Sequence, residues 1–170
     1  STVIFPSNSV LETIGQSAFQ ESGLAAITIP PTLKSVDAQV FRDCHSLVVV
    51  NFPVNSVLET IGPYAFMFTA LTAITVPSTV KLIDRYAFDS CIKLASVTFP
   101  SNSVLETIGI HVFYQNALTA ITIPSTVKLI DRYAFDNCKK LATVTFPSNS
   151  VLETIGIGAF NAATALKAIT

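Results

Sequence analysis

Three cysteines and two histidines are the side chains of this sequence with the greatest potential for nucleophilic or metal chemistry. Cys44, Cys91 and Cys138 follow one another at intervals of 47 residues. His45 follows a cysteine and His111 follows an isoleucine, and neither shares a nucleophile motif with a serine or a cysteine. A catalytic site needs a nucleophile, a base and an orienting group that converge. The sequence therefore predicts no catalytic residues and no enzyme activity.

The interval of 47 residues is a property of the whole chain. The phrase "FPSNSVLETIG" begins at Phe5 and returns, with at most one change, at Phe52, Phe99 and Phe146. The phenylalanines that end each "AF" or "VF" pair are separated alternately by a shorter and a longer gap. The repeating unit is therefore a coil of about 23–24 residues that occurs in two alternating forms.

Each coil contains three recurring pieces. The first, as in "LAAITIP" from Leu24 to Pro30, alternates apolar with small residues and ends in proline, which is typical of a half-buried strand. The second, "VLETIG" or "VKLID", is another short strand closed by glycine or aspartate. The third, around "AFxxC", is long enough for about one helical or 3₁₀ turn. Coils of this size and content are typical of leucine-rich repeats.

The chain resembles the BspA-like (Treponema-type) leucine-rich repeat family. The family motif LxxIxIPxxVxxIxxxAFxxCxx is matched by "LTAITIPSTVKLIDRYAFDNCKKLATVTFP", and the match extends from Val3 to Thr170. The resemblance implies an α/β, strand-dominated repeat solenoid with a parallel β-sheet and short helical turns. It implies about seven coils, each the length of the repeating unit. Many members are surface proteins of host-associated bacteria and protists, some are implicated in adhesion, and the family offers no catalytic residues to transfer.

Stacking of the coils places equivalent residues in columns, about 4.8 Å apart from one coil to the next. The three cysteines are then about 10 Å apart, beyond the ~7 Å between Cα atoms that a disulfide can span. They lie along a line, whereas zinc ligands converge on one point. We expect three buried free thiols, with no metal and no cofactor.

A second column alternates in charge at every coil. It is interpreted as a self-neutralising ladder that keeps the coils in register, with a charged binding stripe as the alternative. Its members are Glu12, Lys34, Glu59, Lys81, Glu106, Lys128 and Glu153.

A third column lies between the two buried residues of the first strand, and we expect its side chains to point outward. This flat, nearly uncharged surface is a candidate partner-binding face, because the strand face of leucine-rich repeats often binds partners. It lacks aromatic and arginine anchors, so a solvated strand surface is the alternative. An ice-binding surface is disfavoured because only one rank of threonines is present. The candidate face comprises Thr28, Asn51, Thr75, Thr98, Thr122 and Thr145.

Residues that differ between copies are candidate loop contacts. These are Met67, Phe68, His111 and Tyr114. We expect Met67, Phe68 and Tyr114 to gather, with Tyr86 and Tyr133, on the side of the solenoid that carries the predicted helical turns. Drift at permissive loop positions is the alternative.

Composition narrows the class of partner. Half of the residues are hydrophobic, 12% are charged and the formal net charge is −1, so no basic field would attract nucleic acid. No apolar run reaches the ~20 residues of a membrane span, so no membrane insertion is expected. The predicted function is a non-catalytic interaction or adhesion module of an extracellular or cell-surface protein, with a protein or glycan partner.

The ends of the chain support an alternative function. The sequence begins and ends within predicted strands and shows no polar capping coil. We therefore expect residues 1–170 to form a single leucine-rich repeat solenoid domain that is part of a longer array. The alternative is a structural element that stacks end to end in a filament or coat, through self-association of uncapped solenoid ends.

Overall fold

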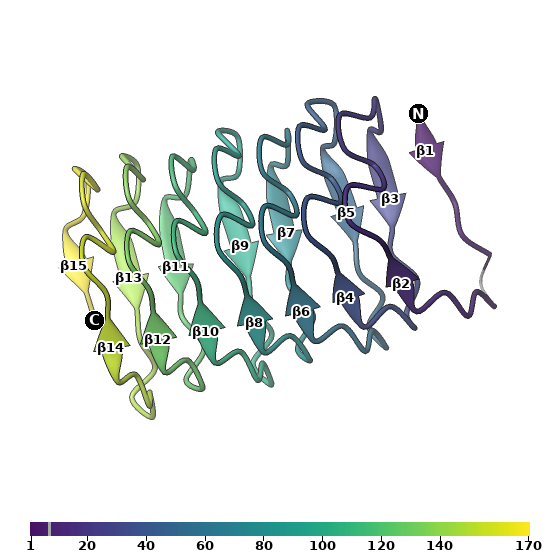
Figure 1. Cartoon of the computed structure of the whole chain (residues 1–170). Helices are drawn as coiled ribbons and strands as arrows, with labels where there is room; N and C mark the ends of the chain where they lie inside the picture. The colour runs from purple at the N-terminus through teal and green to yellow at the C-terminus, as the bar shows by residue number, and fades with distance from the viewer. Residues whose placement is uncertain (7) are drawn as a thin grey trace.

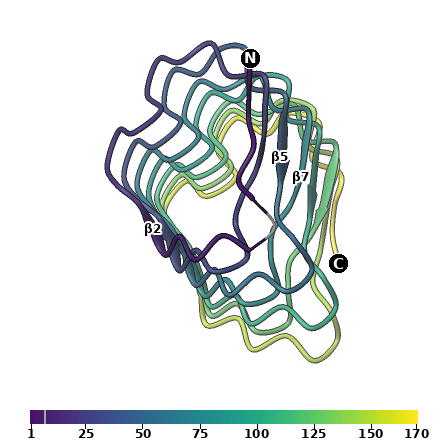
Figure 2. The ribbon, with the colours of Figure 1, turned by 90° about the vertical axis from the view of Figure 1, so that its right-hand side faces the viewer.

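The computed structural model describes residues 1–6 and 8–170, which wind into a solenoid of about seven coils (Figure 1). Every coil contributes one strand to each of two sets, and neighbouring strands within a set run parallel. The view along the solenoid shows the two sets on different sides of a common interior, with β2 on one side and β5 and β7 on the other (Figure 2). The predicted parallel leucine-rich repeat solenoid is confirmed.

The first set of strands arises from the "LxxIxIP" pieces. In each full strand the central residue is buried and its neighbours are more exposed, as the alternating pattern predicts. These strands are β1 (Thr2–Val3), β3 (Ala26–Thr28), β5 (Val49–Asn51), β7 (Ala73–Thr75), β9 (Ser96–Thr98), β11 (Ala120–Thr122), β13 (Thr143–Thr145) and β15 (Ala168–Ile169).

The second set forms one continuous seven-stranded parallel sheet, in the order β14-β12-β10-β8-β6-β4-β2. Its strands are two residues long, and in all but the last the second residue is buried. They are β2 (Thr13–Ile14), β4 (Ser35–Val36), β6 (Thr60–Ile61), β8 (Leu82–Ile83), β10 (Thr107–Ile108), β12 (Leu129–Ile130) and β14 (Thr154–Ile155).

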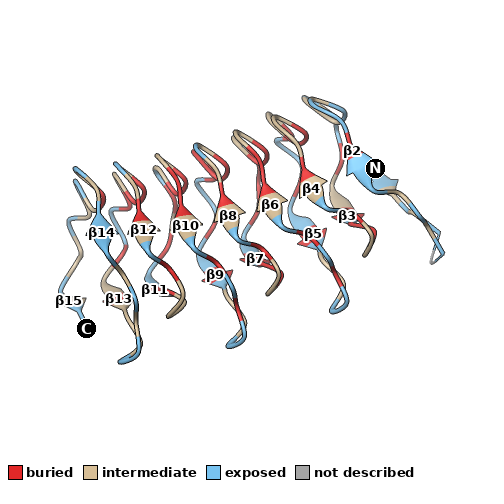
Figure 3. Cartoon of the chain, turned by 60° about the horizontal axis from the view of Figure 1, so that its bottom comes forward, coloured by how far each residue is buried: buried red, intermediate tan, exposed pale blue. Residues whose placement is uncertain are grey.

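The core is built from columns of identical or similar side chains. A phenylalanine column runs through the interior, and successive rings stack with centroids 5.2–5.7 Å apart and planes within 21° of parallel. Its five central members are completely buried, and burial falls off toward both ends of the solenoid (Figure 3). The column comprises Phe19, Phe41, Phe66, Phe88, Phe113, Phe135 and Phe160.

The segments expected to form short helical turns are not helical, and residues 1–6 and 8–170 contain no helix at all. Within this part of the chain there is consequently no helix long and apolar enough to cross a membrane. We call the segments in question the turn segments. They comprise residues 15–22, 37–44, 62–69, 84–91, 109–116, 131–138 and 156–163.

The backbone of the turn segments explains why the helical prediction is wrong. In residues 62–69, Tyr64 and Phe68 adopt φ angles of 59° and 58°, which a right-handed helix cannot accommodate. The N–H groups of Tyr64, Phe66 and Phe68 donate to carbonyls of the next coil at 2.8–3.1 Å. The alternate N–H groups donate to carbonyls three residues back within the same coil. The segment is thus a run of β-turns that is hydrogen-bonded to its neighbour at every second residue.

The first set of strands is not one continuous sheet. It divides into β1-β3-β5, β7-β9 and β11-β13-β15. Where strands pair, the N–H groups of Ile29, Val76 and Ile123 donate to the next coil at 2.9–3.0 Å. At the equivalent positions Phe52 and Phe99, the N–H groups make no backbone hydrogen bond within the described residues. We call these two breaks, β5/β7 and β9/β11, the open junctions.

Candidate binding surfaces

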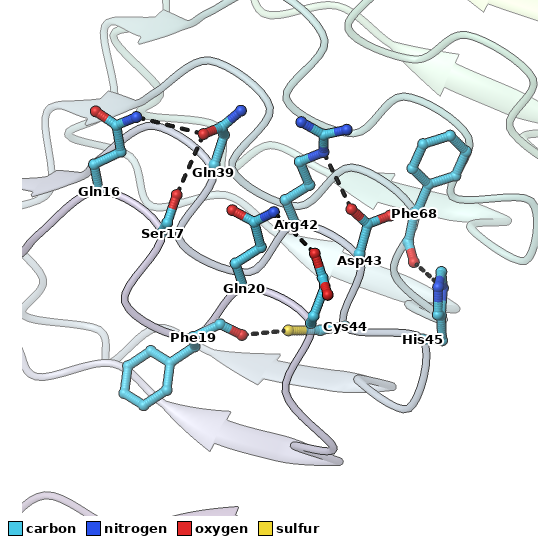
Figure 4. Close-up of polar contacts among 11 residues, drawn as sticks. Gln16, Ser17, Phe19, Gln20, Gln39, Arg42, Asp43, Cys44, His45 and Phe68 are labelled. Carbon is cyan, nitrogen blue, oxygen red and sulfur yellow. Dashed lines mark hydrogen bonds and ion pairs between the residues drawn. The ribbon is translucent and has the colours of Figure 1, made fainter.

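The cysteine column is buried and unpaired, as predicted. The thiol of Cys44 donates to the carbonyl of Phe19 across 2.9 Å (Figure 4). Cys91 and Cys138 donate in the same way to phenylalanine carbonyls of the preceding turn segment at 3.1 and 3.0 Å. Burial raises the pKa of Cys91 and of Cys138 to about 12. These two thiols are therefore protonated at neutral pH and unsuited to nucleophilic chemistry.

Alkylation should reveal this burial directly. We expect Cys91 and Cys138 to remain unmodified by iodoacetamide in the native protein at neutral pH, and to react fully once the chain is unfolded. The same burial also predicts a pH dependence of stability. An unfolded thiol has a pKa near 9.0, whereas burial raises the pKa of these folded thiols to about 12. The free energy of unfolding should therefore fall as the pH rises from about 9.0 to about 12. Intact-mass spectrometry with and without denaturant measures the labelling. Complete native labelling at the rate seen in the unfolded protein would contradict the structure.

The charge column forms three separate ion pairs rather than a continuous ladder. In each pair a lysine Nζ lies 3.0 Å from the carboxylate of the glutamate in the preceding coil. No ion pair links these lysines to the glutamate of the following coil within the described residues. The side chains are 50–65% exposed, so each pair contributes at most about 1 kcal/mol. The pairs are Lys34–Glu12, Lys81–Glu59 and Lys128–Glu106.

The candidate partner-binding face points outward, as the alternation predicts. We call it the Thr face, and it comprises Thr28, Asn51, Thr75, Thr98, Thr122 and Thr145. All of its residues are exposed except the last, which is half-buried.

Each open junction forms a groove on the Thr face. The groove between β9 and β11 has a volume of about 640 Å³ and is lined by Thr98, Thr122 and the following proline turns. The groove between β5 and β7 has a volume of about 500 Å³ and is lined by Asn51 and Thr75. Both grooves lie where neighbouring strands of the first set do not pair. The Thr face is therefore hollowed at two places rather than flat.

The candidate loop contacts fall into two places. His111 stacks between Tyr86 and Tyr133, with ring centroids 5.1 Å away on each side, and Tyr114 meets it edge-on at 5.3 Å. Sequence reasoning did not include Tyr64 in this row, although its ring stacks on that of Tyr86 at 5.0 Å. The signal for Tyr64 was its position, because it occupies the same place in its turn segment as Tyr86, His111 and Tyr133 do in theirs.

Phe68 lies apart from this aromatic row. Its carbonyl is 3.0 Å from Nδ1 of His45 (Figure 4), and its side chain lines a different groove together with His45 and Lys93. Met67 is half-buried beside it in the chain. The structure therefore brings together His111 and Tyr114, while Phe68 belongs to another part of the surface.

The sequence matches one known family of repeats. The family described as "BspA type Leucine rich repeat region (6 copies)" matches residues 1–67 and 59–170. No protein of curated function matches the sequence significantly.

Solved structures share the fold. A leucine-rich repeat protein of T. pallidum superposes with a TM-score of 0.82 at 23% identity, covering 98% of this chain and 78% of that one. A leucine-rich cell surface protein of Faecalibacterium prausnitzii A2-165 gives 0.58 at 28% identity, covering 82% and 43%. The pneumococcal vaccine antigen PcpA gives 0.54 at 22% identity, covering 86% and 50%. The chain thus spans half or less of the last two proteins.

The matched family region includes every coil of the solenoid. The chain belongs to the BspA-type leucine-rich repeat family.

Proposed function

We propose that this chain is a non-catalytic interaction or adhesion module of a cell-surface or secreted protein, and that it binds a protein or glycan through the Thr face. The observation that carries the proposal is the pair of grooves at the open junctions, which gives an otherwise flat strand surface the concavity that binding sites share. The description of one similar structure as a cell surface protein, and of another as a vaccine antigen, supports the location.

A matched pair of substitutions tests the role of the Thr face. Thr98→Arg and Thr122→Arg place long charged side chains in the groove between β9 and β11. We expect each to weaken binding about tenfold or more, measured by surface plasmon resonance against whichever immobilised host matrix protein or glycan the unmodified chain binds saturably. Thr107→Arg is the control, because it makes the same change in the second sheet of the same coil. Equal losses for all three variants would exclude the Thr face.

The second candidate function is a structural element that stacks end to end. It is supported by the stacking itself, because near-identical coils pair in parallel register and a further copy could continue the same arrangement. Light scattering after size exclusion separates the two functions. A monomer at every concentration would exclude stacking, whereas growth into rods without saturable partner binding would favour it.

A further inference from the structure

Apart from Lys167 near the C-terminus, the lysines of this protein fall into two groups. Those of the charge column are each neutralised by a glutamate at 3.0 Å. Lys93, Lys139 and Lys140 are exposed and form no ion pair within the described residues. All three lie directly after the turn segments, in the two coils that carry Cys91 and Cys138. Three lysines without an ion pair among the described residues therefore follow two of the turn segments.

These lysines line two adjoining grooves. One groove, of about 320 Å³, contains Lys93, and the other, of about 260 Å³, contains Lys139 and Lys140. The two grooves share Ile92 and Gln115, so they form one continuous surface, which we call the lysine edge. Among the described residues, no aspartate or glutamate lines either groove.

The carboxylates that lie nearest to these lysines in the sequence accept hydrogen bonds from other side chains. Asp89 is buried and accepts the hydroxyl hydrogen of Ser90 at 2.6 Å. Asp136 accepts a hydrogen bond from the side-chain amide of Asn161 at 2.9 Å. The charge of the lysine edge is therefore available to an external anion.

The edge also carries groups that suit a sugar chain. The amide side chains of Gln115 and Asn137 supply hydrogen-bond donors and acceptors beside the lysines. Ile92 is 66% exposed and Phe68 is 37% exposed, which gives an apolar surface against which a ring can lie.

The spacing of the lysines indicates the shape of the ligand. Lys93 and Lys140 occupy equivalent positions two coils apart, so their backbones are separated by about 10 Å. Cationic positions repeated along an edge fit a linear polymer with repeated anionic groups.

The backbone argues against an extended peptide as the ligand. In the turn segments beside the lysines, the N–H groups of Ser90, Gln115 and Asn137 already donate to the next coil at 2.8–3.1 Å. A peptide strand would find few free backbone groups to pair with here, so recognition must come from side chains.

We propose that the lysine edge binds a polysaccharide bearing sulfate or carboxylate groups, held by Lys93, Lys139 and Lys140 with help from the amides of Gln115 and Asn137. The site is separate from the Thr face, and its existence does not depend on the binding proposed there.

Two matched triple variants test the site. The edge variant carries Lys93→Gln, Lys139→Gln and Lys140→Gln. The control variant carries Lys34→Gln, Lys81→Gln and Lys128→Gln, which removes the same charge from lysines that are already paired. Binding of heparin and of polygalacturonate is measured by isothermal titration calorimetry, with circular dichroism to verify folding. We expect at least one polymer to bind the unmodified protein, to bind the edge variant about tenfold or more weakly, and to bind the control with little change. Added salt should weaken this binding.

Each other outcome overturns the proposal. Absence of binding to both polymers, equal loss in both variants, or equally tight binding of neutral dextran would do so. Tighter binding of poly-glutamate than of either polysaccharide would assign the edge to acidic peptides instead. If the edge triple variant is unfolded, Lys140→Gln alone against Lys128→Gln makes the same comparison. Heparin binding that is unchanged by Thr98→Arg would show that this site is separate from the Thr face. Each proposal is therefore tested by its own substitutions, and failure of one does not contradict the other.

Discussion

Replacing Phe88 by alanine is expected to lower the free energy of unfolding by about 3–5 kcal/mol. The Phe88 ring is completely buried and stacks on Phe66 at 5.2 Å and on Phe113 at 5.7 Å. Its removal leaves a cavity in the middle of the column and takes contact from the coils on both sides, which depend on their neighbours for stability. Urea denaturation followed by circular dichroism measures the change.

Phe160→Ala is the matched control for this loss. Phe160 occupies the same position in its coil but is half-buried, and among the described residues its ring stacks on Phe135 alone, at 5.2 Å. We expect it to cost less than half as much as Phe88→Ala, because it removes one neighbour and opens toward solvent. Equal losses in the free energy of unfolding at the two positions would mean that stacking on both sides of a phenylalanine adds no stability beyond that of one neighbour.

The second large effect is expected at Gly109. A Cβ atom at this position would lie 2.9 Å from the backbone nitrogen of Arg85 and 3.0 Å from the carbonyl oxygen of Ile83 in the preceding coil. The Ile83 carbonyl accepts the inter-coil hydrogen bond of the Gly109 N–H at 2.9 Å. The Arg85 N–H donates to Asp84 Oδ1 at 2.6 Å. Both are backbone atoms of the preceding coil, so making room for a Cβ atom requires the coils to move apart. Gly109→Ala should therefore cost about 1–3 kcal/mol and lower Tm, measured by calorimetry.

Gly15 provides a control that the repeat itself supplies. It occupies the same position in the first described coil, where a Cβ atom would meet no other atom within 4 Å. Gly15→Ala is expected to be neutral or slightly stabilising, because alanine restricts the unfolded chain. If Gly15→Ala were as harmful as Gly109→Ala, local backbone conformation rather than coil stacking would explain the glycine.

The strands, the two coil forms and the inward and outward columns were predictable, because each depends on a pattern within one coil. Ile27 and Thr28 alternate as a strand requires, and a period of 47 residues needs no knowledge of contacts. The turn segments were not predictable in the same way. Positive φ angles at Tyr64, His111 and Tyr133 are not signalled by residue type, since glycine or asparagine is the usual occupant. They are stabilised by hydrogen bonds to the next coil, which no single coil reveals.

The candidate sites show the same division. The Thr face was found because strand alternation fixes which side chains point outward. The open junctions that hollow it were missed, because the same order of coil forms meets at β13 and β15, which do pair, so the alternation of forms does not signal a break. The lysines of the edge were missed because they are spread over two coils. In the sequence they resemble ordinary surface lysines. The structure distinguishes them because it pairs the lysines of the charge column with glutamates and leaves those of the edge without an ion pair among the described residues.

The open junctions also determine how the molecule should respond to tension along its axis. At these two places the first set of strands makes no backbone hydrogen bonds between neighbouring coils within the described residues, so fewer backbone hydrogen bonds must break there. A pulled chain should therefore yield first between blocks of paired coils rather than at every coil. Release of the two-coil block β7-β9, one period of 47 residues, would lengthen the chain by about 160 Å. A protein built this way can absorb a sudden load in a few large steps and still keep the remaining blocks folded.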